Sequence, residues 1–306
     1  MGKPIEQFLP PRAFERPWRA DGRLGLPRGV VVLLFWLAGG GLLIWVSMLL
    51  GSVAPSESTI YHVTLIRIGY TVLLGGSMLG TAYLVPRNDA HAVVAASFMV
   101  TLALATGWFS DLGIAAQPSI GLLFLAGIVR IPIVLIGSLI VLRIFHVEGR
   151  VRAAVGERTG TIVAGLVAGL LIVSLISITH TPTIQHDQHY LLSWTWLDLF
   201  ELLGLAASGL LALRHSRWLA VSATFTAALL VSDAWFDVVS TSASKITQSA
   251  LLALIEIPGA VFCLVVAWHE VSGWDHEILA KGGTPRRLHH QIHQSQVDGS
   301  ESGESS

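Results

Sequence analysis

Seven ionisable side chains set in apolar stretches are the residues of this chain best placed to do chemistry. Asp198 and Glu201 stand three residues apart, and Asp233 and Asp237 stand four apart, so each pair shares one face of a helix. Carboxylates gathered in this way attract positive charge, and the expected ligand is a cation or a small polar solute. The complete predicted binding set is Asp198, Glu201, Asp233, Asp237, Glu256, Arg67 and Arg130.

The elements that must position these residues are transmembrane helices. Hydrophobic residues make up 53% of the chain and charged residues only 13%, and the mean hydropathy is +0.66. Because lipid offers the backbone no hydrogen-bond partner, apolar stretches of about 20 residues must cross it as helices. Eight such stretches are present, at 29–50, 61–85, 92–110, 119–144, 159–179, 193–213, 218–240 and 248–271.

Basic residues predict the orientation of these helices, since cytoplasmic loops are enriched in Lys and Arg. Of the 19 Lys and Arg residues, all but Lys245, Arg67 and Arg130 fall on one side if the N-terminus is cytoplasmic. We therefore expect a multi-pass protein with both termini in the cytoplasm. Arginine is used far more than lysine, alongside much Ala, Leu and Gly, which suggests a GC-rich bacterial genome and a bacterial cell membrane.

The sequence repeats itself with a shift of 127 residues, the separation of Trp108 from Trp235. Gly107-Trp108-Phe109-Ser110 returns as Ala234-Trp235-Phe236-Asp237, and Arg130-Ile131-Pro132 returns one residue early as Glu256-Ile257-Pro258. Four crossings return the chain to the same side, so the two copies run in the same direction. The predicted fold is an all-α polytopic membrane protein with eight transmembrane helices in two parallel four-helix repeats.

This interpretation divides the chain into five parts. A cytoplasmic arm (1–28) precedes the first repeat (29–145), and a basic cytoplasmic linker (146–158) leads to the second repeat (159–271). The tail (272–306) is rich in Gly, Ser and Glu and is predicted to be disordered. Two Gly-x-x-x-Gly spacings, at Gly76 and Gly165, would permit close helix contacts, although 30 glycines make such spacings common.

All seven ionisable residues fall within roughly the outer 16 Å, counted at about 1.5 Å per residue. A charge facing lipid costs about 2.5–3.5 kcal/mol, so these side chains should converge inside the bundle. Five acids against two arginines leave negative charge that must be protonated, solvated or matched by a bound cation.

Three functions fit this cluster. The first is a protein that binds, and can transport, a cation or small polar solute through an outward-facing acidic cavity. The second is a membrane scaffold or partner subunit, for a protein that the sequence does not name, in which the charges are purely structural. The third is a membrane-embedded enzyme, for which no catalytic residue is proposed because no nucleophile accompanies the acids. The sequence does not identify a cofactor, and a net charge of -1 argues against nucleic acid.

A second group of side chains follows the fifth apolar stretch. His180, His186 and His189 lie with Asp187 in a predicted extracellular loop, where they could hold zinc or copper. A polar loop without metal explains the same residues, because His186-x-x-His189 in a loop fixes no geometry.

The second repeat resembles a family of uncharacterised four-helix membrane proteins of actinobacteria. The resemblance covers about 182–268 and rests on Trp196-Leu197-Asp198 with Glu201, on Ser232-Asp233-Ala234-Trp235-Phe236-Asp237, and on Glu256-Ile257-Pro258. It implies a four-helix unit that can exist unduplicated, and it implies no activity. The first repeat departs from this pattern at every acid.

Overall fold

The computed structural model describes residues 28–52, 59–86, 89–105, 130–142, 160–169, 188–240 and 246–282. Within them the regular structure is entirely helical. The principal helices are α2 (Arg28–Ser52), α3 (Thr59–Leu84), α4 (Asp89–Ala105), α7 (Gln188–Leu213), α8 (Leu219–Ser240) and α9 (Ile246–Gly282). Two further helices, Arg130–Leu142 and Gly160–Gly169, are shorter.

Five helices are long and apolar enough to cross a membrane. Their apolar windows are Gly29–Met48, Thr64–Leu84, Trp196–Leu213, Leu219–Val239 and Ala253–Trp274. The other three, Ala90–Ala105, Arg130–Leu142 and Gly160–Gly169, are apolar but only 10–17 residues long in the part that the structure describes. The prediction of an α-helical membrane protein is confirmed at this level, and each described helix overlaps one of the eight predicted stretches.

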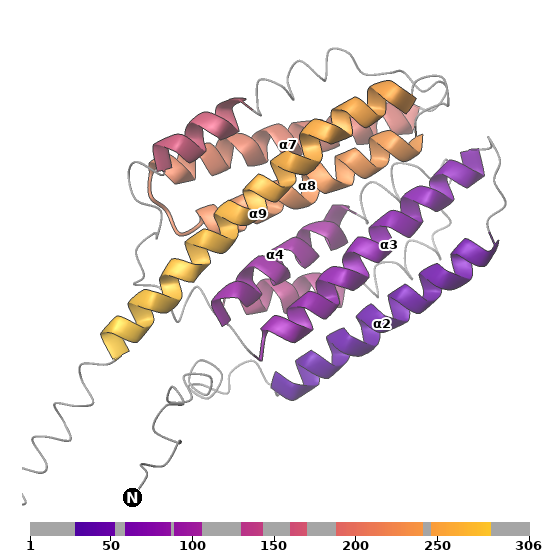
Figure 1. The fold of residues 1–306 in the computed structure, drawn as a ribbon. Helices are drawn as coiled ribbons and strands as arrows, with labels where there is room; N and C mark the ends of the chain where they lie inside the picture. The colour runs from indigo at the N-terminus through magenta and orange to yellow at the C-terminus, as the bar shows by residue number, and fades with distance from the viewer. Residues whose placement is uncertain are drawn as a thin grey trace, which may run out of the picture.

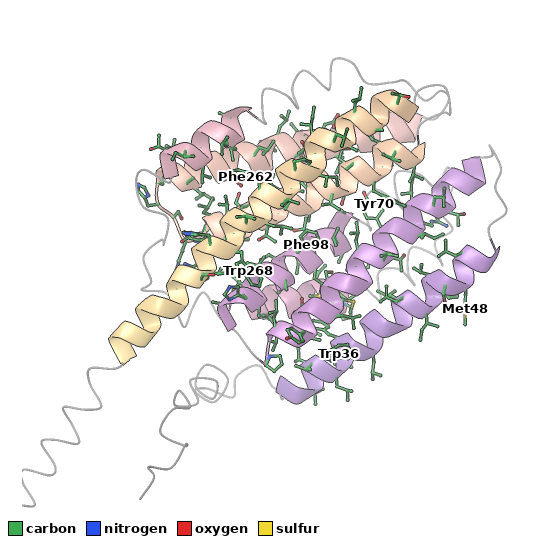
Figure 2. The ribbon with its side chains drawn as sticks, viewed as in Figure 1. Trp36, Met48, Tyr70, Phe98, Phe262 and Trp268 are labelled. Carbon is green, nitrogen blue, oxygen red and sulfur yellow. The ribbon has the colours of Figure 1, made fainter. Side chains whose placement is uncertain are left out.

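The helices lie side by side along one general direction (Figure 1). In the first half α2 packs on α3 and α3 on α4, and in the second half α7 packs on α8 and α8 on α9. The halves meet where α4 contacts α8 and α9, and where α3 contacts α8. Trp36 and Met48 on α2 are exposed side chains on the rim of this bundle, as expected of a surface in lipid (Figure 2).

Glycines permit the closest approaches between helices, but not at the spacings that the sequence suggested. Gly39 of α2 lies against the backbone of Gly75 in α3, and Gly204 of α7 lies against Thr226 in α8. Among the described residues, a Cβ added at Gly76 or Gly165 would meet no atom within 4 Å. Within the described residues, the Gly-x-x-x-Gly spacings therefore make no close helix contact.

Hydroxyl groups join α7 to α8 along the part of both helices that follows the acids on α7 and precedes the acids on α8. Ser208 of α7 lies 2.9 Å from the hydroxyl of Ser222 and 3.3 Å from that of Thr226, and Thr226 also donates to the carbonyl of Ser222. Such bonds hold transmembrane helices together where the hydrophobic effect cannot. They fix the register of the two helices that carry four of the five predicted acids.

A second polar contact joins α4 to α9 at the far end of the bundle. The Nε2 of His91 lies 3.1 Å from the hydroxyl of Ser272, and its ring lies 4.0 Å from that of Trp268, centroid to centroid. One turn away, the indole of Trp274 donates to the buried Glu270 at 3.2 Å. The contacts of His91 anchor the later part of α9 to α4 in the first half, whereas the bond of Trp274 lies within α9.

Two predicted boundaries are corrected. Helix α9 continues to Gly282, so residues 272–282, which were assigned to a disordered tail, are helical. Helix α7 begins at Gln188, so His189 belongs to its first turn and not to a loop. Hydropathy identifies only the apolar part of a helix, whereas the backbone hydrogen bonds continue into polar sequence. Trp108, the expected partner of Trp235 in the repeat, is outside the described residues.

Candidate functional site

Four of the five predicted acids are buried inside the bundle. Glu201 of α7 is 2% exposed, Asp233 and Asp237 of α8 are 5% and 3% exposed, and Glu256 of α9 is 9% exposed. Asp198, one turn before Glu201, is half-buried. None of the four buried acids faces lipid, which is the arrangement that the cost of charge in hydrocarbon favours.

The five carboxylates interact with one another. Glu256 is the strongest electrostatic neighbour of Asp233, followed by Asp237, Glu201 and Asp198. Glu256 in turn interacts with Asp237, Glu201 and Asp198. The spacing of the acids on α7 and α8, together with the packing of α8 on α9, thus brings acids from three helices together. We call these five residues the acid cluster.

Asp233 and Glu256 of the acid cluster each have a buried oxygen atom without a hydrogen-bond partner among the described residues. These atoms are Oδ1 of Asp233 on α8 and Oε2 of Glu256 on α9. The electrostatic neighbours that the described residues give these two carboxylates are all acids. Burying an acceptor without a donor costs about 1–3 kcal/mol of stability, and more if the acceptor is charged. Both oxygen atoms are therefore expected to bind a positively charged or hydrogen-bond-donating partner.

The first half of the chain adds a residue that the sequence analysis missed. Tyr70 of α3 is fully buried, and its hydroxyl lies next to Ser232 and Asp233 of α8. Ser232 donates its own hydroxyl to the carbonyl of Ala228 at 2.7 Å, and the oxygen of Tyr70 has no hydrogen-bond partner of good geometry. Figure 2 labels Tyr70 on α3, the helix that packs on α8.

Trp235 fixes the approach of α3 to α8. Its indole nitrogen donates to the carbonyl of Leu65 at 3.3 Å, and its ring lies directly against Gly69. Trp235 is half-buried and packs against buried apolar side chains within the bundle. Only a residue without a side chain leaves room for the indole at Gly69.

These contacts also show that α3 and α8 run antiparallel. Residue 65 lies near residue 235, whereas Tyr70 lies near Ser232 and Asp233, so the numbers rise in opposite directions. One turn before Tyr70 is Arg67, and one turn after Asp233 is Asp237. Arg67 is half-buried, and its Nε is a buried donor without a hydrogen-bond partner.

The second predicted arginine, Arg130, is the first residue of the helix Arg130–Leu142 and is half-buried. Its role as a counter-charge of the acid cluster stays a prediction. For Arg67, the described residues provide no hydrogen-bond acceptor at Nε, so no acid among them binds this atom.

The predicted histidine metal site lies largely beyond what the structure describes. His180 and His186 are outside the described residues, and for His189 only the helical backbone of α7 is described. In the described ranges, no group of three or more His, Cys, Asp and Glu side chains is close enough together to hold a metal ion. The acid cluster is therefore not a ready-made cage for a divalent metal.

The chain matches no protein-family model, no curated protein and no solved structure. The resemblance of the second half to the actinobacterial four-helix proteins stays a prediction. The acid cluster, with Tyr70 of α3 beside Asp233, is therefore the group of described residues whose chemistry bears on function.

Proposed function

We propose that this protein binds a cation or a small polar solute at the acid cluster and passes it across the membrane. The observation that carries the proposal is the pair of buried, unpartnered oxygens on Asp233 and Glu256, surrounded by further acids. A ligand that brings positive charge or N–H donors would satisfy both oxygens and reduce the repulsion between the carboxylates.

If the protein is a scaffold, the same residues should form a complete network of ion pairs. A purely structural network would pair each buried acid with an arginine, because an unpaired buried charge is strongly destabilising. Arg67 has an unpartnered Nε, and Asp233 has an unpartnered Oδ1 although Tyr70, one turn from Arg67, lies beside it. These unpartnered atoms support a binding site rather than a complete structural network of ion pairs.

The architecture that we propose for transport is eight crossings in two parallel repeats. The packing order supports it, since consecutive helices pack in the same sequence in both halves, and the third helix of each half, α4 and α8, meet each other. The short helices follow this order: Gly137 packs on Val100 of α4, and Gly160 packs on Ala212 of α7. In this arrangement both termini are cytoplasmic in a bacterial cell membrane, and the acid cluster faces outward.

Cation-dependent stability tests the proposed function. Wild-type protein in detergent should unfold at a higher temperature as NaCl or methylammonium chloride is added, relative to choline chloride at equal ionic strength. Glu256→Gln should remove most of this gain, because it replaces an acceptor carboxylate by a neutral amide. Glu270→Gln is a matched control on the same helix, since Gln can still accept the bond from Trp274. If neither cation stabilises the wild type, the proposal fails.

Labelling in whole cells tests the topology. Cysteine replaces Gln188 in one variant and Ser300 in another, and an impermeant maleimide is added outside. The Gln188 variant should be labelled in intact cells, and the Ser300 variant only after lysis, because the basic residues place the tail inside. The native Cys263 is buried, so the background should be low. Labelling of the Ser300 variant in intact cells contradicts the orientation.

A further inference from the structure

The acid cluster brings two carboxyl groups close together, and neither can donate a hydrogen bond when it is ionised. Glu256 of α9 is the strongest electrostatic neighbour of Asp233 on α8, and each has a buried oxygen without a partner among the described residues. An ionised carboxylate only accepts hydrogen bonds, so two of them cannot satisfy each other. A protonated carboxyl group can donate, so one proton supplies a missing hydrogen bond and removes one of the two charges.

We propose that Asp233 and Glu256 share a proton when no ligand is bound, and that a cation binding at the acid cluster displaces this proton into water. This inference rests on the proposed function and specifies its coupling, because the site then exchanges a cation for a proton. The charges balance, since the carboxyl pair gives up one H⁺ and receives one positive charge from the cation.

The groups around this pair favour keeping the proton. Among the described residues, the charged groups that act on the two carboxyls are all acids. Like charges repel strongly in a site away from water, so carboxyl groups that share such a site do not all ionise together. The titratable groups that face the pair are Asp198 and Glu201 of α7, Asp237 of α8 and Tyr70 of α3, with Cys263 of α9 beside Glu201.

The basic groups on the neighbouring helices do not offset this negative charge. Arg67 of α3 stands one turn before Tyr70 and is not among the groups that act on Asp233 or Glu256. His91 of α4 lies against Ser272 at the far end of α9. The positive charge that balances the pair is therefore a proton or a bound cation, and the two compete for the same oxygens.

Tyr70 supports this exchange from the other half of the chain. Its side chain is fully buried, its hydroxyl lies next to Asp233, and its oxygen has no hydrogen-bond partner of good geometry. A phenol hydroxyl can both accept and donate. It can accept a hydrogen bond from Asp233 in the protonated form and donate one to Asp233 after the proton has left. A group that serves both forms suits a site that alternates between them.

Proton release and the pH dependence of binding test this inference on the full chain in detergent. Methylammonium chloride is added to a weakly buffered solution that contains a pH-indicator dye, with choline chloride at equal ionic strength as the baseline. Binding should release up to about one proton per cation, and the affinity from thermal shift should rise up to about tenfold per pH unit, the slope for one exchanged proton. Both effects should disappear at higher pH, once the pair is ionised without a ligand.

Two variants locate the proton. Glu201 acts on both members of the pair, so Glu201→Gln removes a negative neighbour and makes the proton easier to lose. The pH range in which affinity rises should therefore move to lower pH. Glu270→Gln is the control, because Glu270 is fully buried on α9 and accepts a hydrogen bond from Trp274. This control should keep the pH range of the wild type.

The outcomes separate the exchange from the proposed function. If methylammonium stabilises the wild type equally at every pH and releases no proton, the exchange inference is wrong while the cation site stands. If neither methylammonium nor sodium stabilises the protein at any pH, the proposed function itself is wrong. An unchanged pH range in Glu201→Gln also overturns the inference, since the displaced proton must then come from elsewhere. If that variant does not fold, proton release and the slope in the wild type still decide the question.

Discussion

Asp233→Asn should abolish the stabilisation of this protein by cations and leave the protein without ligand at least as stable as wild type. The reason is the environment of Asp233, whose electrostatic neighbours among the described residues are all acids. Removing its charge relieves repulsion and lowers the cost of burial. Removing one partner of a structural ion pair would instead cost about 3–5 kcal/mol. The two interpretations therefore predict changes of different sign.

The measurement is thermal unfolding in detergent, with and without methylammonium chloride. Thr224→Val is the control on the same helix, because Thr224 is buried and donates only to the carbonyl of Ala220 in its own helix, at 2.6 Å. This control should keep the cation response. A large drop in the unfolding temperature of Asp233→Asn without ligand would support the structural network and contradict the binding site.

Gly69→Ala should destabilise the protein by about 1–3 kcal/mol, the usual cost of overpacking. The new Cβ would overlap the indole of Trp235, which is held in place by its bond to Leu65. The matched control is Gly76→Ala on the same helix, where the added Cβ meets no described atom within 4 Å. That control should gain about 0.5–1 kcal/mol from the higher helix propensity of alanine.

A double-mutant cycle attributes this effect to the α3–α8 contact. Trp235→Ala removes the ring that Gly69 accommodates, so Gly69→Ala should cost little when introduced into that variant. Reversible unfolding in mixed micelles gives all four free energies. Equal costs of Gly69→Ala in the two backgrounds would mean that the glycine serves another contact.

The positions of the helices were largely readable from the sequence, because hydropathy reports directly on the solvent that a segment faces. Every described helix overlaps a predicted stretch, and α8 at Leu219–Ser240 matches the predicted 218–240 almost residue for residue. The largest error is the end of α9, since polar residues after 271 stop the hydropathy signal and do not stop a helix. The number of membrane crossings was harder to predict, because three of the described helices are short.

Burial of the acids was also predictable, because a charged residue in lipid is costly wherever it lies. Their partners were not. Tyr70 looks like an ordinary apolar or interfacial residue in the sequence, and its place beside Asp233 depends on a contact between residues 163 positions apart. Its one available signal was its position three residues after Arg67 on the same helix face. Likewise Gly69 is one glycine among 30 in the sequence. Only its contact with the indole of Trp235 shows that a larger residue would not fit there.

The length of α9 has a consequence beyond the membrane. The helix continues from Trp274, the last residue of its apolar span, to Gly282, which is about 12 Å further along its axis. Figure 1 shows this end projecting past the other helices. At physiological ionic strength surface charge is screened over about 8 Å, so the attraction of anionic headgroups is weak at that distance. In the membrane arrangement proposed above, the helix would therefore hold Gly282 in the aqueous phase, at a distance from the lipid surface.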